Sequence, residues 1–200
     1  MTGMPGAGKS TVANSLKEKG FLVITMGDIV REEARQQNLE MTDENLGNLM
    51  LKLRNDLGPG AIAHLILKNV EKEIVDGDIS ANIVIDGIRS IAEVEVLKTI
   101  GHVKLLAIHA ATTTRFGHLK ERARSDAPVI RDNSIIREKR ELAVGISEAI
   151  ALADETLSNN NLTIEELKEK AFEIIQKWII EINNNSNSNN SSIRKLQRRN

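Results

Sequence analysis

The chain has 200 residues, a length that favours one domain with a core of its own. Its 27 basic and 28 acidic residues balance, which argues against a nucleic-acid partner, and the absence of cysteine excludes disulfides and thiolate metal sites. No apolar run approaches the ~20 residues of a membrane span and no signal-peptide pattern is present, so we expect a cytoplasmic globular protein with no membrane partner.

Apolar segments alternate with amphipathic ones, which is typical of an α/β protein with a parallel sheet. The first helix is predicted from Lys9 to Lys19, with Gly20 as a left-handed cap. Four short, mostly apolar runs are predicted to form strands that are covered on both faces: Leu22 to Thr25, Ile83 to Asp86, Val103 to Ala110 and Ala153 to Ser158.

Two helices are predicted between the first two of these strands. They cover Asp43 to Leu57 and Ala61 to Ile74, and Gly58-Pro59-Gly60 separates them. Another helix begins after the second strand, because Ser90 and Glu93 match a capping box.

The last helix has the clearest pattern. Thr163 and Glu166 match a second capping box, and an apolar stripe at helical spacing follows. Trp178 belongs to this stripe, so we expect it to pack on the sheet. A tract rich in Asn and Ser with four basic residues comes next, and we predict that residues 183–200 are a disordered, solvated tail.

The stretch GMPGAGKS fits the phosphate-loop pattern G-x-x-x-x-G-K-[ST] at every fixed position. Its glycines let backbone N–H groups turn toward phosphate oxygens, and the helix that begins there adds a favourable dipole. Lys9 is expected to reach the β- and γ-phosphates of ATP, and the Ser10 hydroxyl to ligate Mg²⁺. The predicted nucleotide-binding residues are Gly3, Met4, Pro5, Gly6, Ala7, Gly8, Lys9, Ser10 and Thr11.

Asp86 ends an apolar strand, which is the Walker B arrangement. Because the carboxyl ends of parallel strands line one crevice, Asp86 is expected to lie near the phosphate loop and to hold Mg²⁺ with Ser10, through water. A strand-end aspartate can instead cap a helix or satisfy a turn. The presence of the phosphate loop favours the metal site.

Two arginines, Arg31 and Arg89, also follow strand ends. A guanidinium makes bidentate contacts to phosphate, so the two are candidates for binding an acceptor phosphate opposite the γ-phosphate of ATP. The alternative for Arg31 is a surface pair with Glu32 or Glu33.

Residues 114–141 are unusually basic. Eight Lys or Arg and four acids lie between Arg115 and Arg140, a net charge of about +4 in a neutral protein. With a break at Pro128 and a second helix from near Ser134, this segment is predicted to be a helix-loop-helix lid that brings positive charge to the phosphates. The alternative is a solvated pair of basic helices. His118 is interpreted as a surface residue.

The stretches GMPGAGKS, TMGDIVREE, IVIDGIRS, RFGHLKERARSD and ALADETLSNNNLTIEEL together resemble adenylate-kinase-like nucleotide kinases. More narrowly, the sequence is similar to an archaeal P-loop nucleotide-kinase-like family related to adenylate kinase and dephospho-CoA kinase. The resemblance implies a three-layer α/β/α P-loop fold over residues 1–182, with parallel strands in the order 2-3-1-4-5. It also implies a helical acceptor-binding insert at about 28–75 and a short lid at about 114–141.

The same resemblance implies roles for individual residues. Asp28 and Arg31 would lie at the phosphate end of the acceptor, with Arg89 beside them. Asp-Gly-Ile-Arg lacks the proline and one residue of the Asp-Gly-Phe-Pro-Arg stretch usual in adenylate kinases, which leaves the acceptor geometry open. Arg122 and Arg124 would come from the lid, so the predicted catalytic set is Lys9, Arg89, Arg122 and Arg124.

Three functions fit these motifs. The first is a Mg-ATP-dependent kinase acting on a small phosphorylated acceptor such as a nucleoside monophosphate. The second is a nucleotide-binding regulatory switch or slow NTPase without a small-molecule acceptor. The third, an RNA-associated kinase or ATPase, rests only on the basic lid and tail. The acceptor, the nucleotide base and the oligomeric state are not defined by the sequence.

Only Met1 and Thr2 precede the phosphate loop, where the central strand of this fold normally lies. Loss of that strand would leave buried backbone groups unpaired at about 1–3 kcal/mol each. We therefore expect that the natural protein begins several residues upstream or that this start site is misassigned, with Met1 and Thr2 as the end of the first strand.

Overall fold

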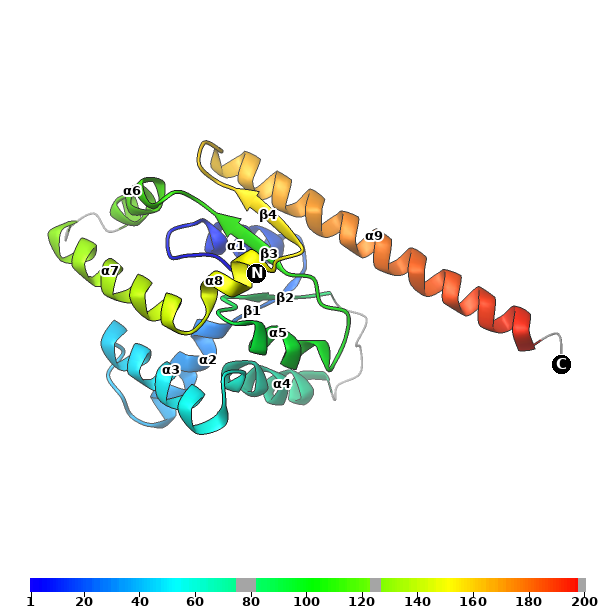
Figure 1. Cartoon of the computed structure of the whole chain (residues 1–200), viewed down its shortest axis with the longest axis horizontal. Coiled ribbons are helices and arrows are strands. Elements are labelled where there is room, and N and C mark those ends of the chain that lie inside the picture. The colour runs from blue at the N-terminus through cyan, green and yellow to red at the C-terminus, as the bar shows by residue number, and fades with distance from the viewer. Residues whose placement is uncertain (75–81, 123–126, 198–200) are drawn as a thin grey trace.

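A computed structural model describes residues 1–74, 82–122 and 127–197 of the chain. Its strands form two parallel pairs (Figure 1). Strands β1 (Leu22–Thr25) and β2 (Ile83–Asp86) form one pair, and β3 (Leu106–His109) and β4 (Glu155–Ser158) form the other. All four strands were predicted; the last two begin later than expected, at residues 106 and 155.

The two amino-terminal residues lie between these pairs. The N–H of Thr2 donates to the carbonyl of Leu106 at 2.9 Å, and the N–H of Ile108 donates to the carbonyl of Thr2 at 3.0 Å. On the other side Thr2 forms a parallel bridge with Ile88, whose N–H donates to the carbonyl of Met1 at 3.1 Å. Among the described residues, these two connect the strand pairs, and the full order 2-3-1-4-5 stays a prediction.

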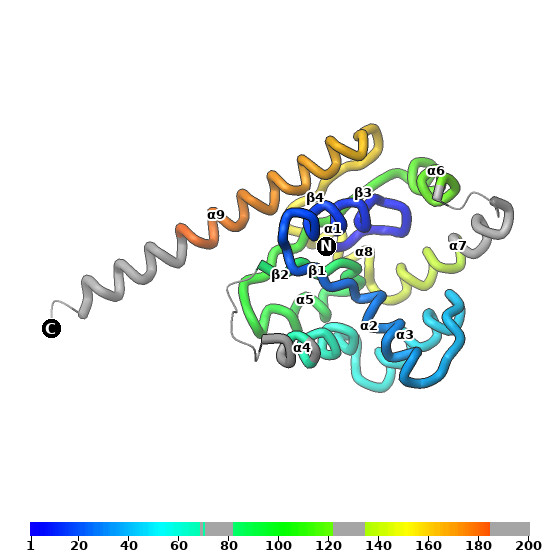
Figure 2. Tube along the Cα trace, turned by 180° about the vertical axis from the view of Figure 1, so that it is seen from behind, coloured from blue at the N-terminus to red at the C-terminus, as the bar shows by residue number. Residues whose placement is uncertain are grey.

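One face of the strands is covered by α1 (Lys9–Glu18) and α9 (Ile164–Gln197). Figure 2 shows the first part of α9 running beside α1 and β4. Trp178 belongs to the apolar cluster on this face, so the predicted packing of Trp178 is confirmed. Other members of the cluster are Val12, Leu16, Val84, Ile108, Leu167 and Ala171.

The opposite face carries four helices, α2 (Met26–Gln36), α3 (Asp43–Leu57), α4 (Ala61–Ile74) and α5 (Ile91–Lys98) (Figure 1). A second apolar cluster lies between these helices and the strands. Ile83 and Ile85 of β2 pack against it, whereas Val84 between them belongs to the first cluster. Because successive side chains of a strand point to opposite faces, β2 is covered on both sides, as its apolar run predicts. The predicted helices α3 and α4 are confirmed, while α2 was not among the predicted elements.

The predicted lid corresponds to α6 (Thr112–Arg122) and α7 (Ala127–Ala143), and α8 (Ile146–Ala151) follows it. The expected helix break at Pro128 is wrong, since Pro128 is the second residue of α7. Proline is tolerated in the first turn because its missing N–H has no intrahelical acceptor there.

The structure also differs from the prediction that residues 183–200 are disordered. Helix α9 continues to Gln197, and residues 198–200 lie outside the described part. Its amino terminus is well capped, because the Thr163 hydroxyl accepts from the N–H of Glu166 at 3.2 Å and the Glu166 carboxylate accepts from the N–H of Thr163 at 2.8 Å. Once a helix is formed, each further residue adds a hydrogen bond without a new nucleus, so helix can extend into a sequence of weak propensity.

A cavity of about 790 Å³ lies at the amino ends of the strands, away from the phosphate loop. Its lining is mainly apolar and includes Met1, Ile83, Leu105, Val70, Trp178 and Ile182. The cavity is therefore separate from the phosphate loop, none of whose residues line it. No helix in the described part of the chain combines the length and the apolar character needed to cross a bilayer.

Candidate phosphate-binding site

In the phosphate loop, residues 3–10, each carbonyl group of residues 3–8 accepts a hydrogen bond. Side chains from three distant positions bond to the carbonyls of residues 5–7. Donors within the loop or in α1 bond to the carbonyls of residues 3, 4 and 8. The donors are Lys9 Nζ to Gly3 (2.6 Å) and Met4 (3.3 Å), Arg115 Nη1 to Pro5 (3.1 Å), His118 Nδ1 with Gly6 (3.0 Å), Asn159 Nδ2 to Ala7 (2.9 Å) and the N–H of Thr11 to Gly8 (3.1 Å).

This arrangement leaves N–H groups of the loop available to a ligand. The N–H groups of Gly6, Gly8, Lys9 and Ser10 donate to no acceptor within the described residues. Successive N–H groups at a helix amino terminus form a concave site for an anion, and the helix dipole favours negative charge there. The loop therefore has the backbone arrangement that its sequence pattern predicts, with N–H groups that have no acceptor in the described residues.

Two glycines are required by this geometry. Gly6 has φ +81°, and a Cβ there would lie 2.6 Å from the carbonyl oxygen of Arg115. Gly8 has φ +109°, and its Cβ would lie 2.7 Å from Nδ2 of Asn159. Any other residue would be strained at both positions and would push away a group that supports the loop.

Lys9 folds back over the loop. Its side chain is half-buried, and this burial lowers the pKa of Lys9 to about 8; Asp86 opposes the shift, and Arg89 adds to it. An ammonium that is short of counter-charge is stabilised when an anionic ligand arrives. Lys9 thus lies on the loop with a positive charge that the protein compensates only in part.

Ser10 and Asp86 fit the magnesium site expected from the sequence. Asp86 is only 5% exposed, and its Oδ1 has no hydrogen-bond partner among the described residues. A buried carboxylate oxygen without a partner is costly unless a ligand or ion completes it. Ser10 is exposed in the first turn of α1. No group of three His, Asp or Glu that could hold a metal occurs in the described ranges, so the phosphates would supply the other ligands.

Arg89, just past β2, makes a buried ion pair with Glu141 of α7. Its Nε donates to Glu141, and its Nη1 donates to the carbonyl of Gly87 at 3.1 Å. Burial disfavours the charged guanidinium, but Glu141 outweighs it and raises the pKa of Arg89 above its usual value. Burial likewise disfavours ionisation of Glu141, yet the charges of Arg89, Arg137 and Lys9 hold its pKa below the ordinary range.

The backbone of Arg89 is fixed by a second buried pair. Glu93 of α5 accepts from the N–H of Arg89 at 2.7 Å and from the N–H of Ser90 at 3.2 Å, and it pairs with Arg54 of α3. The predicted capping box of Ser90 and Glu93 is confirmed, and the structure adds Arg54 to it.

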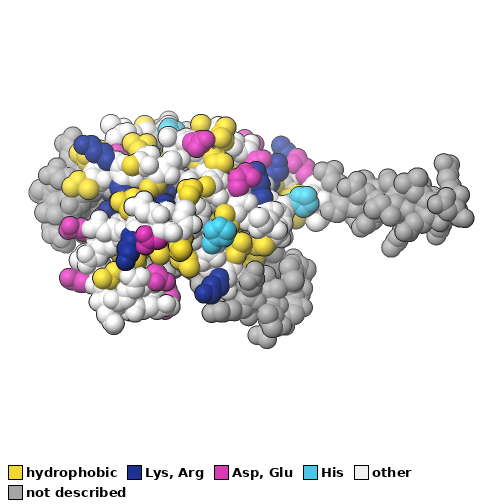
Figure 3. Space-filling view, turned by 60° about the horizontal axis from the view of Figure 1, so that its bottom comes forward, with side chains coloured by type: hydrophobic (Ala, Val, Ile, Leu, Met, Phe, Trp, Pro, Cys, Tyr) yellow, Lys and Arg dark blue, Asp and Glu magenta, His cyan; other side chains and the backbone are white. Residues whose placement is uncertain are grey.

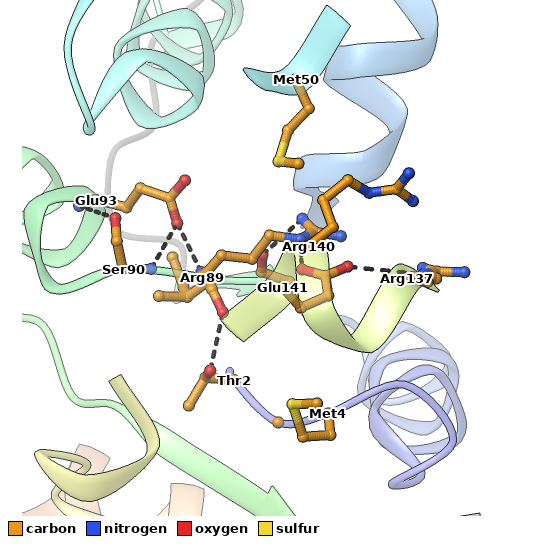
Figure 4. Close-up of polar contacts among 12 residues, drawn as sticks. Thr2, Met4, Met50, Arg89, Ser90, Glu93, Arg137, Arg140 and Glu141 are labelled. Atoms are coloured by element: carbon orange, nitrogen blue, oxygen red, sulfur yellow. Dashed lines mark hydrogen bonds and ion pairs between the residues drawn. The ribbon is translucent and has the colours of Figure 1, made fainter. Parts of the chain in front are cut away.

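Helix α7 also contacts α3 of the insert. Arg140 Nη2 lies 2.7 Å from Asp43 Oδ2, and the Arg140 guanidinium fills the space beside Gly47. Arg137 Nε lies 3.6 Å from Glu141 Oε1. Figure 4 shows Arg89, Glu141, Arg137 and Arg140 gathered between Met50 of α3 and Met4 of the phosphate loop.

Other predicted residues lie elsewhere. Arg31 Nε donates to Asp28 Oδ1 at 3.1 Å within α2, so its partner is Asp28 instead of Glu32 or Glu33. Within the described residues, no hydrogen bond or ion pair joins Asp28 or Arg31 to Arg89. Arg122 is the last residue of α6 and its side chain lies outside the described part, as does all of Arg124.

Several residues that support the loop were not predicted from the sequence. Arg115, expected to face the phosphates with the rest of the lid, is buried and donates to Ala110, Pro5, Thr112 and Glu138. The interpretation of His118 as a surface residue is wrong, since it is half-buried against Gly6. Asn159 follows the end of β4, so the strand-end rule that found Asp86 could have found it.

We expect Asn159→Ala to weaken binding of Mg-ATP about tenfold, because a buried carbonyl left unpaired costs about 1–3 kcal/mol and loosens the loop. Asn161→Ala, at an exposed position two residues on, is the matched control and should have no effect. Calorimetric titration with a non-hydrolysable ATP analogue measures both. Equal affinities for the two variants would contradict the role of Asn159.

Comparison with known proteins shows the family to which the chain belongs. Residues 2–136 match the family model described as AAA domain. The chain is 39% identical over 183 residues to a UPF0200 protein of Pyrococcus abyssi (88% of this chain, 94% of the relative). It is 40% identical over 173 residues to one of Methanocaldococcus jannaschii (86% and 82%). The TT1252 protein of Thermus thermophilus shares the fold, with a TM-score of 0.57 at 17% identity over 88% of this chain and 94% of that one. The chain thus belongs to the AAA domain family of P-loop proteins and to the archaeal UPF0200 proteins.

Proposed function

We propose that the protein is a Mg-ATP-dependent phosphotransferase whose acceptor is a small molecule that itself carries a phosphate, such as a nucleoside monophosphate. One observation carries the proposal. The chain has a formed phosphate loop and, just past the carboxyl end of β2, a half-buried arginine, Arg89, whose charge interacts with both Lys9 and Asp86. Two anion-binding groups at one edge of a sheet are what transfer between two phosphates requires.

The phosphate loop would bind the donor. Its free N–H groups would surround the β-phosphate, and Lys9 would move from the carbonyls of Gly3 and Met4 to bridge the β- and γ-phosphates. This exchange replaces neutral acceptors by charged ones, so it favours the loaded state.

Ser10 and Asp86 would hold Mg²⁺, Ser10 by its hydroxyl and Asp86 through water. The metal, when bound, neutralises charge that develops on the phosphate oxygens. Asp86 also faces Lys9, and its negative charge favours the protonated lysine. In this way one carboxylate would orient both cations of the donor site.

Arg89 would hold the acceptor phosphate. Its Nε and Nη1 are engaged by the protein, while its Nη2 donates to no acceptor within the described residues. That nitrogen is available to a ligand without disturbing the pair that fixes the side chain. Asp28 and Arg31 of α2 and the lid arginines Arg122 and Arg124 are proposed as additional contacts made when insert and lid close.

A transfer assay tests this function. The full chain with Mg-ATP is offered each common nucleoside monophosphate and dephospho-CoA, and phosphorylated products are separated by chromatography. We expect product from at least one acceptor. ATP hydrolysis without transfer to any of them would contradict the proposal and favour the second candidate, a nucleotide-dependent switch.

Arg89→Lys separates the two candidates. Lysine keeps a charge for Glu141 but lacks the planar fork, so transfer should fall about 100-fold while affinity for Mg-ATP stays within about threefold. Arg35→Lys, an exposed position of α2, is the control. Unchanged transfer in the Arg89 variant would exclude Arg89 as the acceptor-binding group.

The RNA-associated alternative has less support. On the face shown in Figure 3, basic and acidic side chains are interspersed, with no basic side chains gathered into one area. Several lid arginines are also paired with acids: Arg115 with Glu138, Arg137 with Glu141, and Arg140 with Asp43. Pairing reduces the positive charge that a phosphate backbone would meet.

A further inference from the structure

We propose that Glu141 is a positioning residue that sets the anion affinity of the acceptor site. It holds the guanidinium of Arg89, and its negative charge lowers the affinity of Arg89 for an incoming phosphate. This inference rests on the proposed acceptor role of Arg89 and extends it to a residue outside the recognised motifs.

The burial of Glu141 carries the first part of the argument. Its side chain is 5% exposed, although it is a carboxylate on a lid helix. A charge removed from water in this way is costly unless it is paired and hydrogen-bonded. Glu141 accepts from Arg89 Nε and faces Arg137 at 3.6 Å, so two arginines from different elements share this single acid.

The charges around Glu141 give the second part. Lys9 and Arg89 each interact electrostatically with Asp86 and Glu141, and Arg137 interacts with Glu141. Arg54 and Glu93, paired with one another, add one charge of each sign beside Arg89. A phosphate that reaches Arg89 is therefore attracted by Arg89, Lys9 and Arg137, and the nearby carboxylate of Glu141 repels it. Removing one unit of negative charge a few ångströms away should increase anion affinity at least about tenfold, since charges interact strongly at the low effective dielectric of a partly buried site.

A comparison with Arg115 supports a functional pair. Arg115 is also buried and paired with an acid of α7, yet all three of its guanidinium nitrogens donate to protein acceptors. Arg89 leaves Nη2 without an acceptor in the described part of the chain. Arg115 is thus saturated as a structural brace, whereas Arg89 is held on one side and open on the other.

The test is binding of inorganic phosphate to the full chain, with the loop saturated by Mg²⁺ and a non-hydrolysable ATP analogue. Glu141→Gln keeps an oxygen that can accept from Arg89 Nε and removes the charge, so phosphate should bind about tenfold more tightly. Glu148→Gln, an exposed glutamate of α8, should leave the affinity unchanged. A residue with only a structural role would give weaker or equal binding in the Glu141 variant, and that result would overturn the proposal.

Two further variants locate the effect. Arg89→Gln/Glu141→Gln replaces the ion pair by two amides, leaves no unpaired buried charge, and should lose the phosphate site. Tight phosphate binding in this double variant would show that the anion does not bind at Arg89, which also overturns the proposal. Arg137→Gln lies at a 45% exposed position and is expected to fold; it should weaken phosphate binding several-fold. Because no transfer is measured, these results do not depend on whether an acceptor is ever phosphorylated.

Discussion

Lys9→Ala is expected to weaken binding of Mg-ATP at least 100-fold. Lys9 supplies the only side-chain ammonium that the described residues place on the phosphate loop. A hydrogen bond to a charged group contributes about 1.5–3 kcal/mol, and Lys9 would make two such contacts with the β- and γ-phosphates. Calorimetric titration with a non-hydrolysable analogue measures the change.

Lys17→Ala is the matched control, because Lys17 lies on the same helix and is exposed. The folded stability of the Lys9 variant should not fall, since an ammonium whose pKa burial lowers does not stabilise the free protein. A reduction of less than tenfold in affinity for Mg-ATP would show that the loop binds phosphate mainly through its backbone.

The pKa of Lys9 gives this prediction a pH dependence. In the free protein burial lowers the pKa of Lys9 to about 8, below the ordinary lysine value of 10.5, and phosphate should raise it again. Above pH 8 a growing fraction of the free protein has lost the Lys9 proton. Binding then takes up a fraction of a proton on average, and the affinity for Mg-ATP falls as the pH rises. Titrations at pH 8.5 in two buffers of different ionisation enthalpy measure this uptake. Lys9→Arg should show none, because arginine stays protonated.

Glu93→Ala should lower the free energy of unfolding by about 3–5 kcal/mol, which is typical when one partner of a buried ion pair is removed. Glu93 has no exposed surface, and its loss leaves Arg54 buried without a counter-ion and leaves the N–H groups of Arg89 and Ser90 unpaired. Arg54 Nε already lacks a partner in the described structure, so it cannot compensate.

Glu95→Ala on the same helix provides the control. Its pair with Lys98 is exposed, at 60% for Glu95 and 51% for Lys98, and such pairs contribute about 0–1 kcal/mol. Urea unfolding of both variants at one pH gives the comparison, and the urea dependence of the free energy should not change. A loss below about 1 kcal/mol for Glu93→Ala would mean that water or another group replaces the carboxylate.

Local sequence patterns predicted most elements correctly, for identifiable reasons. Helices α3 and α4 have their predicted bounds because Gly58-Pro59-Gly60 separates two amphipathic stretches whose periodicity is uninterrupted. The tail and Pro128 were predicted wrongly because composition and a single proline were given more weight than helix propagation and position in the first turn.

The sequence by itself determined the phosphate loop, the strand that ends in Asp86 and the capped helices, because each depends on residues close together in the chain. Only the tertiary structure decided which distant side chains complete the site. Asn159 and Arg115 lie more than 100 residues from the loop they support, and Glu141 lies 52 residues from Arg89. No local pattern distinguishes a lid acid that pairs with Arg89 from one on the surface, since burial and partner are set by how α7 packs against the end of β2.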